Sequence, residues 1–159
     1  MNIPQHYIPK GLTKKDRKTQ KAHIEKLRKS YRRNRYLNRP KLKSFKSKES
    51  PHVVRAKKMY RVSTIQPSKE LAQKTKCSLG TLRKISKKGK GAYYSSGSRP
   101  NQTAHSWARA RLASAVSGGN ASISDYHLLS KGCKPSSKAL RLANKTCKKQ
   151  NKKCVQKHI

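Results

Sequence analysis

Apolar residues recur at helical spacing along the chain, and capping residues mark where the predicted helices begin. Ile24, Leu27 and Tyr31 fall at positions i, i+3 and i+7, which places them on one narrow face of a helix. Thr13 is a typical N-cap just before this segment. The pattern therefore predicts a helix over residues 14–36, preceded by an extended N-terminal segment.

The same signals predict a succession of short helices in the rest of the chain. These helices cover residues 51–60, 68–75, 78–88, 103–117, 125–132 and 136–146. Gly89 is expected to end the third of them, because glycine commonly follows the last helical residue, and residues 91–102 then form a loop. Residues 61–66 alternate apolar and polar positions and predict a short strand. We therefore expect a mainly α fold, a small helical module with at most one or two short strands.

The charge of the chain changes this picture. The many cations repel one another, and the chain has few apolar residues to form a core that would oppose this repulsion. Its 159 residues include 42 Lys and Arg against 5 Asp and Glu, a formal net charge of +37, and only 32% are hydrophobic. Such a chain repels itself and either stays partly disordered or folds against a negative partner. Nucleic acid is the densest polyanion available, with one charge per ~1.7 Å of duplex. An anionic membrane is the second candidate partner for neutralising this charge, and acidic protein surfaces are the third.

The uneven distribution of charge predicts three regions. Residues 1–61 hold 21 of the 42 cations, whereas residues 91–130 hold three, together with the single Trp and three of the seven Tyr. We expect a basic N-terminal arm with one amphipathic helix over residues 1–49, a folded helical module over 50–146, and a Lys-rich tail over 147–159. The expected structural core of the module is Leu71, Leu82, Ile85, Trp107 and Leu112, with Trp107 packed against the 68–88 hairpin.

Residues 70–85 resemble a helix-turn-helix. Ala72 is small enough for two helices to pack closely, Cys77 takes an aliphatic position in the turn, and Ser78 caps the second helix. Lys76 stands where glycine is common, so it must accept a positive φ. The side chains that would then face a major groove are Thr81, Arg83, Lys84 and Lys87. A plain helical hairpin inside a small core explains the same pattern and remains the favoured alternative.

Arginine and lysine clusters give the candidate nucleic-acid-binding residues. They are Arg28, Arg32, Arg33, Arg35, Arg83, Lys84, Lys87 and Arg99. The Gly- and Ser-rich loop before residue 103 adds a candidate anion site, in which backbone N–H groups and Arg99 hold a phosphate and Tyr93 or Tyr94 stacks on a base. The alternative, which we favour, is that Thr103 and its neighbours only satisfy the loop and cap the next helix.

The sequence offers no convincing catalytic or metal site. Ser95, His105 and Asp125 lack the G-x-S-x-G spacing of a nucleophile elbow, so we expect no enzyme, catalytic residue, cofactor or small-molecule substrate. The cysteines Cys77, Cys133, Cys147 and Cys154 form no C-x-x-C pair. Zinc bound by the last three with His158 is disfavoured, since residues i and i+7 lie about 10 Å apart on a helix. We therefore expect no metal and reduced thiols, with Cys77 buried.

Several segments together resemble a family of uncharacterised, strongly basic proteins encoded by giant and other large DNA viruses, with relatives in some phages. They are residues 7–12 (YIPKGL), 50–52 (SPH), 68–85, and above all the block over 93–114. The resemblance transfers no activity or site, but it implies a viral protein packaged in the virion.

From charge and resemblance we expect a structural component of a large double-stranded DNA virus particle, a minor capsid or capsid-lining cementing protein. Its expected partners are other capsid proteins, double-stranded DNA bound without sequence preference, and an anionic inner membrane surface. The alternative is a virus-encoded DNA-binding protein that condenses the genome or reads it through the hairpin. The chain has no apolar run long enough to span a membrane and no secretory signal. We therefore expect synthesis in the host cytoplasm or nucleus and location in the virion.

Overall fold

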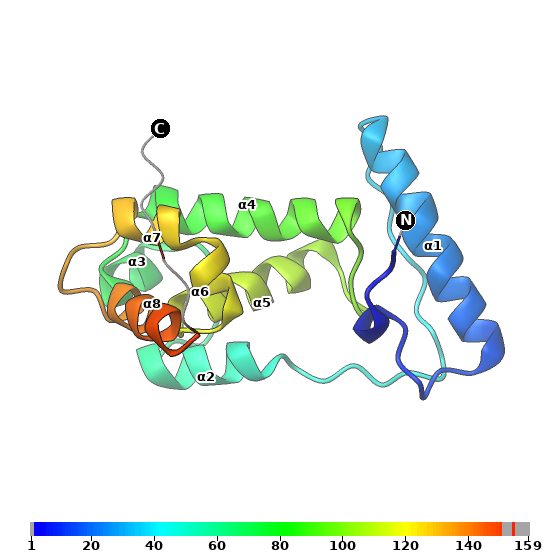
Figure 1. Ribbon diagram of the computed structural model, residues 1–159, viewed down its shortest axis with the longest axis horizontal. Coiled ribbons are helices and arrows are strands. Elements are labelled where there is room, and N and C mark those ends of the chain that lie inside the picture. Colours follow the sequence, from blue (N-terminus) through cyan, green and yellow to red (C-terminus); the bar gives the residue numbers. More distant parts are fainter. Residues whose placement is uncertain (1, 151–153, 155–159) are drawn as a thin grey trace. The chain divides into compact units, whose positions relative to one another are not determined.

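The computed structural model describes residues 2–150 and Cys154, and the regular structure in this part of the chain is helical (Figure 1). The elements are η1 (Gln5–Tyr7), α1 (Lys14–Arg32), α2 (Pro51–Tyr60), α3 (Lys69–Thr75), α4 (Leu79–Ser95), α5 (Ala104–Val116), α6 (Asn120–Ser124), α7 (Tyr126–Gly132) and α8 (Lys138–Lys149). The expected mainly α fold is confirmed. Among these helices none is long and apolar enough to cross a membrane.

The chain divides into two compact units, each built from two separate segments. Unit 1 comprises Met1–Lys48 and Lys90–Trp107, and unit 2 comprises Glu49–Gly89 and Ala108–Ile159. Both α4 and α5 therefore contribute one end to each unit. The first boundary falls where the sequence placed the end of a basic arm, but residues 1–48 do not stand alone, because they fold together with residues 90–107. The Lys-rich tail expected over 147–159 lies largely outside the described residues.

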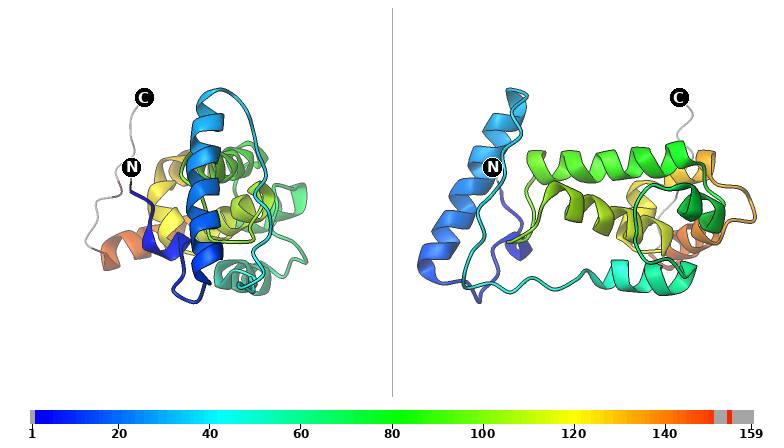
Figure 2. Two further views of the ribbon diagram at one scale, coloured as in Figure 1. Left: turned by 90° about the vertical axis from the view of Figure 1, so that its right-hand side faces the viewer. Right: turned by 180° about the vertical axis from the view of Figure 1, so that it is seen from behind.

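In unit 1 the chain returns beside α1 after the helix ends (Figures 1 and 2). Thr13 caps α1, and its side chain accepts a hydrogen bond from the backbone N–H of Asp16 at 3.1 Å. The Asp16 carboxylate in turn accepts from the backbone N–H of Ser44 at 3.0 Å and from the Ser44 hydroxyl. These bonds lower the pKa of Asp16, since they favour its charged form. The start of α1 thus binds a segment from the end of the region expected to be a basic arm.

The core of unit 1 is small and aromatic. Leu27, Tyr93 and Ala104 are buried in it, and Trp107 packs on this cluster while remaining partly exposed. The Trp107 ring meets the Tyr7 ring edge-on, with 5.8 Å between the centroids. Trp107 therefore belongs to unit 1, and the expectation that it packs on the 68–88 hairpin is wrong. Its neighbours include residues of the N-terminal region, Tyr7 and Leu27, which sequence spacing alone could not place beside it.

Gly89 does not end α4, and the helix continues to Ser95. A Cβ atom at Gly89 would lie 2.7 Å from the Cα atom of Ala108, so the glycine allows α4 and α5 to approach closely. The stop expected at residue 89, and a loop beginning at 91, are both wrong for this reason. A glycine required for helix packing has the same appearance in a sequence as a glycine that ends a helix.

Unit 2 contains the larger apolar core. Leu71, Leu82, Ile85 and Leu112, the aliphatic residues expected there, are fully buried. The Tyr60 hydroxyl donates to the Val116 carbonyl at 2.5 Å, and burial raises the pKa of this tyrosine. Residues 61–66 form no strand. In the described part of the chain, extended pairing is confined to an isolated antiparallel bridge between Cys77 and Cys133.

Candidate nucleic-acid interface

Helices α3 and α4 follow one another directly and are joined by a short turn, residues 76–78. The positions that form the inner side of a helix-turn-helix are buried, namely Leu71, Thr75, Cys77, Leu82 and Ile85. Lys76 takes the left-handed conformation in the turn, with φ of 56° and ψ of 35°. The sequence-based expectation of a positive φ at this residue is confirmed. The Ser78 hydroxyl accepts from the backbone N–H of Thr81 at 3.2 Å, which caps α4.

The outer face of α4 carries three of the predicted DNA-binding residues. Arg83, Lys84 and Lys87 are exposed, and their spacing places them along one side of the helix. Thr81 differs from the expectation, because only 7% of its surface is exposed. Its hydroxyl accepts from Ser78 at 2.8 Å, and its side chain fills the space beside Gly132. Thr81 therefore supports the motif from inside and is not a base-contacting residue.

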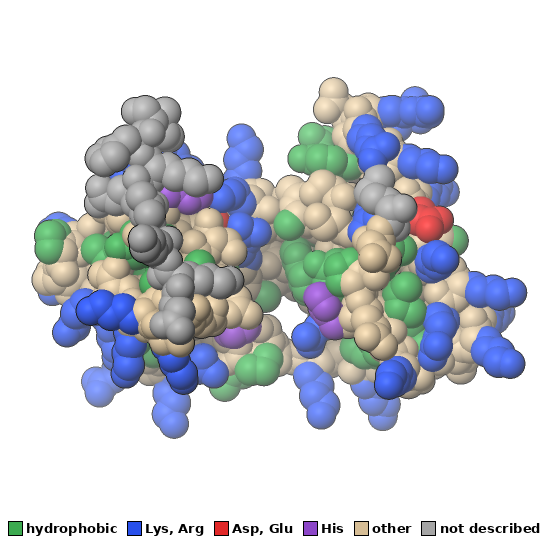
Figure 3. Space-filling model, viewed as in Figure 1, with side chains coloured by type: hydrophobic (Ala, Val, Ile, Leu, Met, Phe, Trp, Pro, Cys, Tyr) green, Lys and Arg blue, Asp and Glu red, His purple; other side chains and the backbone are tan. Residues whose placement is uncertain are grey.

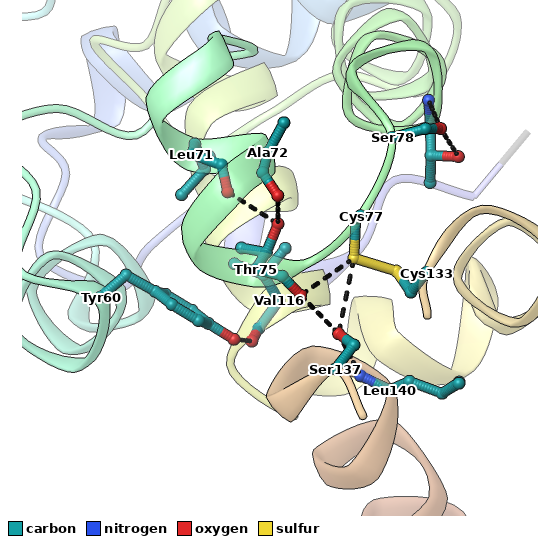
Figure 4. The surroundings of a disulfide bond; sticks show 11 residues. Tyr60, Leu71, Ala72, Thr75, Cys77, Ser78, Val116, Cys133, Ser137 and Leu140 are labelled. Atoms are coloured by element: carbon teal, nitrogen blue, oxygen red, sulfur yellow. Dashed lines mark hydrogen bonds between the residues drawn. A yellow bond between two sulfur atoms is a disulfide. The ribbon is translucent and has the colours of Figure 1, made fainter. Parts of the chain in front are cut away.

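The turn of the hairpin is fastened to the segment between α7 and α8 (Figure 4). Cys77 forms a disulfide with Cys133, and the two Cα atoms are 3.9 Å apart. Backbone bonds flank the pair, from Ser78 N–H to the Gly132 carbonyl at 2.8 Å and from Lys134 N–H to the Lys76 carbonyl at 2.9 Å. The first helical turn of α4 is thus held by covalent and backbone bonds together.

Both disulfides contradict the expectation of reduced thiols. Cys147 and Cys154 form the second bond, so no free cysteine is present among residues 2–150 and 154. Three of the four zinc ligands considered from the sequence are therefore engaged with sulfur, and His158 lies outside the described residues. The sequence could not reveal the first pair, because 56 positions separate Cys77 from Cys133 and only the fold brings them together.

The candidate DNA-binding arginines of the N-terminal region differ in their exposure to solvent. Arg32, Arg33 and Arg35 are exposed near the end of α1. Arg28 is instead buried, and its Nε and Nη2 donate to the Ser96 carbonyl at 3.1 and 2.8 Å. Exposed cations continue along α1 at Lys14, Lys15, Arg17, Lys18, Lys21, Lys26 and Lys29. The helix therefore presents a basic surface to solvent, while Arg28 serves the interior of unit 1.

The loop of residues 96–103 is more constrained than the sequence suggested. The N-terminus of α5 is capped by Thr103 and Ser106, since each side chain accepts from the other's backbone N–H, at 3.0 and 2.9 Å. Tyr93 is buried and donates to the Gln102 carbonyl at 3.2 Å. Tyr94 stacks on Tyr31 with 6.2 Å between centroids. These interactions favour the capping interpretation over a phosphate site at α5 with tyrosines stacked on a base.

Arg99 is exposed in the same loop, and a residue that sequence reasoning overlooked lies close to it. The Arg39 guanidinium donates to the Ser98 carbonyl at 3.3 Å, to the Ser98 hydroxyl, and to the Arg99 carbonyl at 3.5 Å. It also lies over the Tyr93 ring, 4.9 Å from the centroid. No periodicity marks Arg39, which follows the end of α1 in an irregular segment.

Carboxylates neutralise few of the cations. Both oxygens of Asp125, which is fully buried, are engaged: Arg111 donates to them at 2.8 and 2.9 Å, and Lys88 lies 3.0 Å from Oδ1. Exposed pairs join Glu49 to Lys57 and Glu70 to Lys74. With five acidic side chains for 42 basic ones, the chain cannot balance its own charge. Figure 3 shows Lys and Arg side chains (blue) widely spread over the visible face, and Asp and Glu (red) rarely.

Comparison with known proteins gives a family but no characterised relative. The chain has no match among curated proteins and none among solved structures. The model of a family of unknown function, DUF5824, matches residues 4–128, which is most of the chain, and the protein therefore belongs to that family.

Proposed function

We propose that this protein is a structural, non-enzymatic protein that binds double-stranded DNA mainly through phosphate contacts. The observation that carries the proposal is the large excess of exposed cations, because five acidic side chains cannot neutralise 42 basic ones. A duplex supplies the opposite charge at high density, and neutralising it releases counterions. The proposal needs no base-specific contact.

The viral setting is part of the same proposal. The resemblance of residues 7–12, 50–52, 68–85 and 93–114 to basic proteins of large DNA viruses supports a role in the particle, as a minor capsid or capsid-lining cementing protein. Other capsid proteins are then its protein partners. An anionic inner membrane surface is a further binding partner. Mass spectrometry of purified particles, before and after nuclease treatment, tests this setting. Retention in nuclease-treated empty particles supports a capsid role, whereas absence from particles would exclude it.

A second candidate function is sequence reading by the α3–α4 hairpin. The burial of the five inner positions of the motif, together with the left-handed Lys76, favours it. Arg83, Lys84 and Lys87 would then enter the major groove, with the exposed Lys76 and Lys134 near the flanking phosphates. This candidate predicts a preference among duplexes of equal length, which the first function does not.

One binding experiment tests both functions. Fluorescence anisotropy with a set of duplexes of equal length and different sequence is measured over a salt series. With about ten phosphates neutralised, the log–log slope is about −9. The informative variant replaces Arg83, Lys84 and Lys87 with Ala. The matched control replaces the exposed α8 residues Arg141, Lys145 and Lys148 with Ala, which removes the same charge from unit 2.

Each function has its own expected result in this experiment. If the hairpin contacts DNA, its triple variant flattens the slope by about three, and the α8 variant changes it less. If the two variants change the salt slope equally and the wild type shows no preference among the duplexes, the hairpin is rejected as the element that reads sequence. Non-specific DNA binding then remains as the function. A slope near zero in the wild-type protein would reject DNA binding through phosphate contacts altogether.

A further inference from the structure

Two arginine side chains and the backbone of a third arginine meet at one short loop in unit 1. Arg28, from α1, donates twice to the Ser96 carbonyl, and Arg39 donates to both the carbonyl and the hydroxyl of Ser98. Arg99 follows in the same loop with an exposed side chain. Four successive loop residues therefore bring together two inward guanidinium groups and one outward group.

The two inward guanidinium groups keep donors that the protein does not satisfy. Arg28 is only 6% exposed, yet its Nη1 is buried without a hydrogen-bond partner, and so is the Nε of Arg39. Neither arginine pairs with a carboxylate in the described part of the chain. A buried charged donor without an acceptor is costly, and buried polar groups in native proteins are almost always satisfied. An anion bound nearby would offset the positive charge of both groups.

Holding the loop does not by itself explain the charges. The same loop is also held by a neutral group, since Gln20 Nε2 donates to the Ser98 carbonyl at 3.1 Å and to the Tyr7 carbonyl at 3.0 Å. The Gln20 amide therefore binds the loop without introducing a charge. Two guanidinium groups used for the same purpose place positive charge at the loop that no carboxylate of the described residues pairs with.

A phenol lies within the field of all three arginines. Burial raises the pKa of Tyr7, against the opposing effect of Arg28, Arg39 and Arg99. The hydroxyl is therefore protonated at neutral pH and can donate a hydrogen bond. Guanidinium forks with an added hydroxyl donor suit the several oxygens of a phosphate better than the two of a carboxylate.

We propose that Arg28, Arg39, Arg99 and the Tyr7 hydroxyl form a binding site for a single phosphate group. Arg99 and the partly exposed Arg39 receive the group, and Arg28 supplies charge from beneath the loop. The site goes beyond the proposed function, because inorganic phosphate alone can occupy it. A phosphate of bound DNA offers the same chemistry, so the experiment has an arm for each source.

Inorganic phosphate is the probe, titrated into the full chain with chloride adjusted to constant ionic strength. Calorimetry and thermal unfolding are expected to show one saturable site that stabilises the fold. Arg99→Ala and Tyr7→Phe are each expected to weaken phosphate binding about tenfold, the effect of one lost charge-assisted hydrogen bond. Arg55→Ala and Tyr36→Phe, at exposed positions, are the matched controls and are expected to change it less than twofold.

The proposal is overturned if phosphate acts only as chloride does at equal ionic strength. It is also overturned if the control variants weaken binding as much as Arg99→Ala and Tyr7→Phe, because phosphate would then be scattered over the basic surface. Saturation with duplex DNA before the titration identifies the source: lost phosphate binding indicates a DNA phosphate, and unchanged binding indicates the free anion. Duplex binding without a phosphate site would reject this inference and leave the proposed function intact.

Discussion

Breaking the Cys77–Cys133 disulfide is expected to lower the free energy of unfolding by up to about 4 kcal/mol. The bond joins residues 56 positions apart, and the chain-entropy relation for a closed loop of that length gives about this value at 25 °C. For Cys147–Cys154, which are seven positions apart, the same relation gives roughly 2 kcal/mol. Both values are upper estimates, since a reduced unfolded chain keeps some compactness.

Urea denaturation followed by far-UV circular dichroism measures this effect. The proteins compared are the wild type, Cys133→Ala and Cys154→Ala, each with and without a thiol reductant. Cys133→Ala is expected to lose more stability than Cys154→Ala, and reductant is expected to bring the wild type below both. If reductant leaves the wild type unchanged and Cys133→Ala is as stable as wild type, the long loop is not closed and the reasoning is refuted.

Two further predictions concern helix packing and the start of α1. Gly91→Ala should stabilise the protein by up to about 1 kcal/mol, because alanine favours a helix interior, whereas Gly89→Ala should destabilise it by about 1–2 kcal/mol, because its methyl group meets Ala108. Thermal unfolding checks the opposite signs, and stabilisation by both changes would contradict the close approach. Hydrogen bonds from Ser44 lower the pKa of Asp16 below its ordinary value of 3.8, so its contribution is complete above that pH and is lost as the pH falls through the lower folded pKa. The stability difference between wild type and Asp16→Asn should therefore shrink from pH 5 to pH 2, and a constant difference would refute the bond.

Local capping determined most of what could be predicted from the sequence. Thr13 and Ser78, the caps named from the sequence, each accept from a backbone N–H three residues later, at 3.1 and 3.2 Å. A cap depends on neighbours within one turn, so its residue type alone predicts where a helix begins. The hairpin was predictable for the same reason, since its inner positions and its turn lie within 16 residues.

Features that depend on distant partners could not be predicted in this way. Arg28 and Lys29 are adjacent cations in the sequence, but only Arg28 meets the Ser96 carbonyl, 68 positions away. Its burial follows from the face of α1 that packs in unit 1, where Leu27 is also buried. The sequence predicted a basic N-terminal arm with one amphipathic helix over residues 1–49, separate from the folded module. Hydrogen bonds from Gln20, Arg28 and Arg39 instead join this region to residues 96–99.

The interleaved segments of the two units have a consequence for synthesis on the ribosome. Residues 1–48 leave the ribosome before their partner segment, Lys90–Trp107, has been made. At 5–20 residues per second, the 59 residues from Lys48 to Trp107 take about 3–12 s. During that interval residues 1–48, which hold 17 of the 42 Lys and Arg, are available to cellular polyanions before they can fold. A variant that lacks residues 1–48 would likewise leave Lys90–Trp107 without the segment against which it packs.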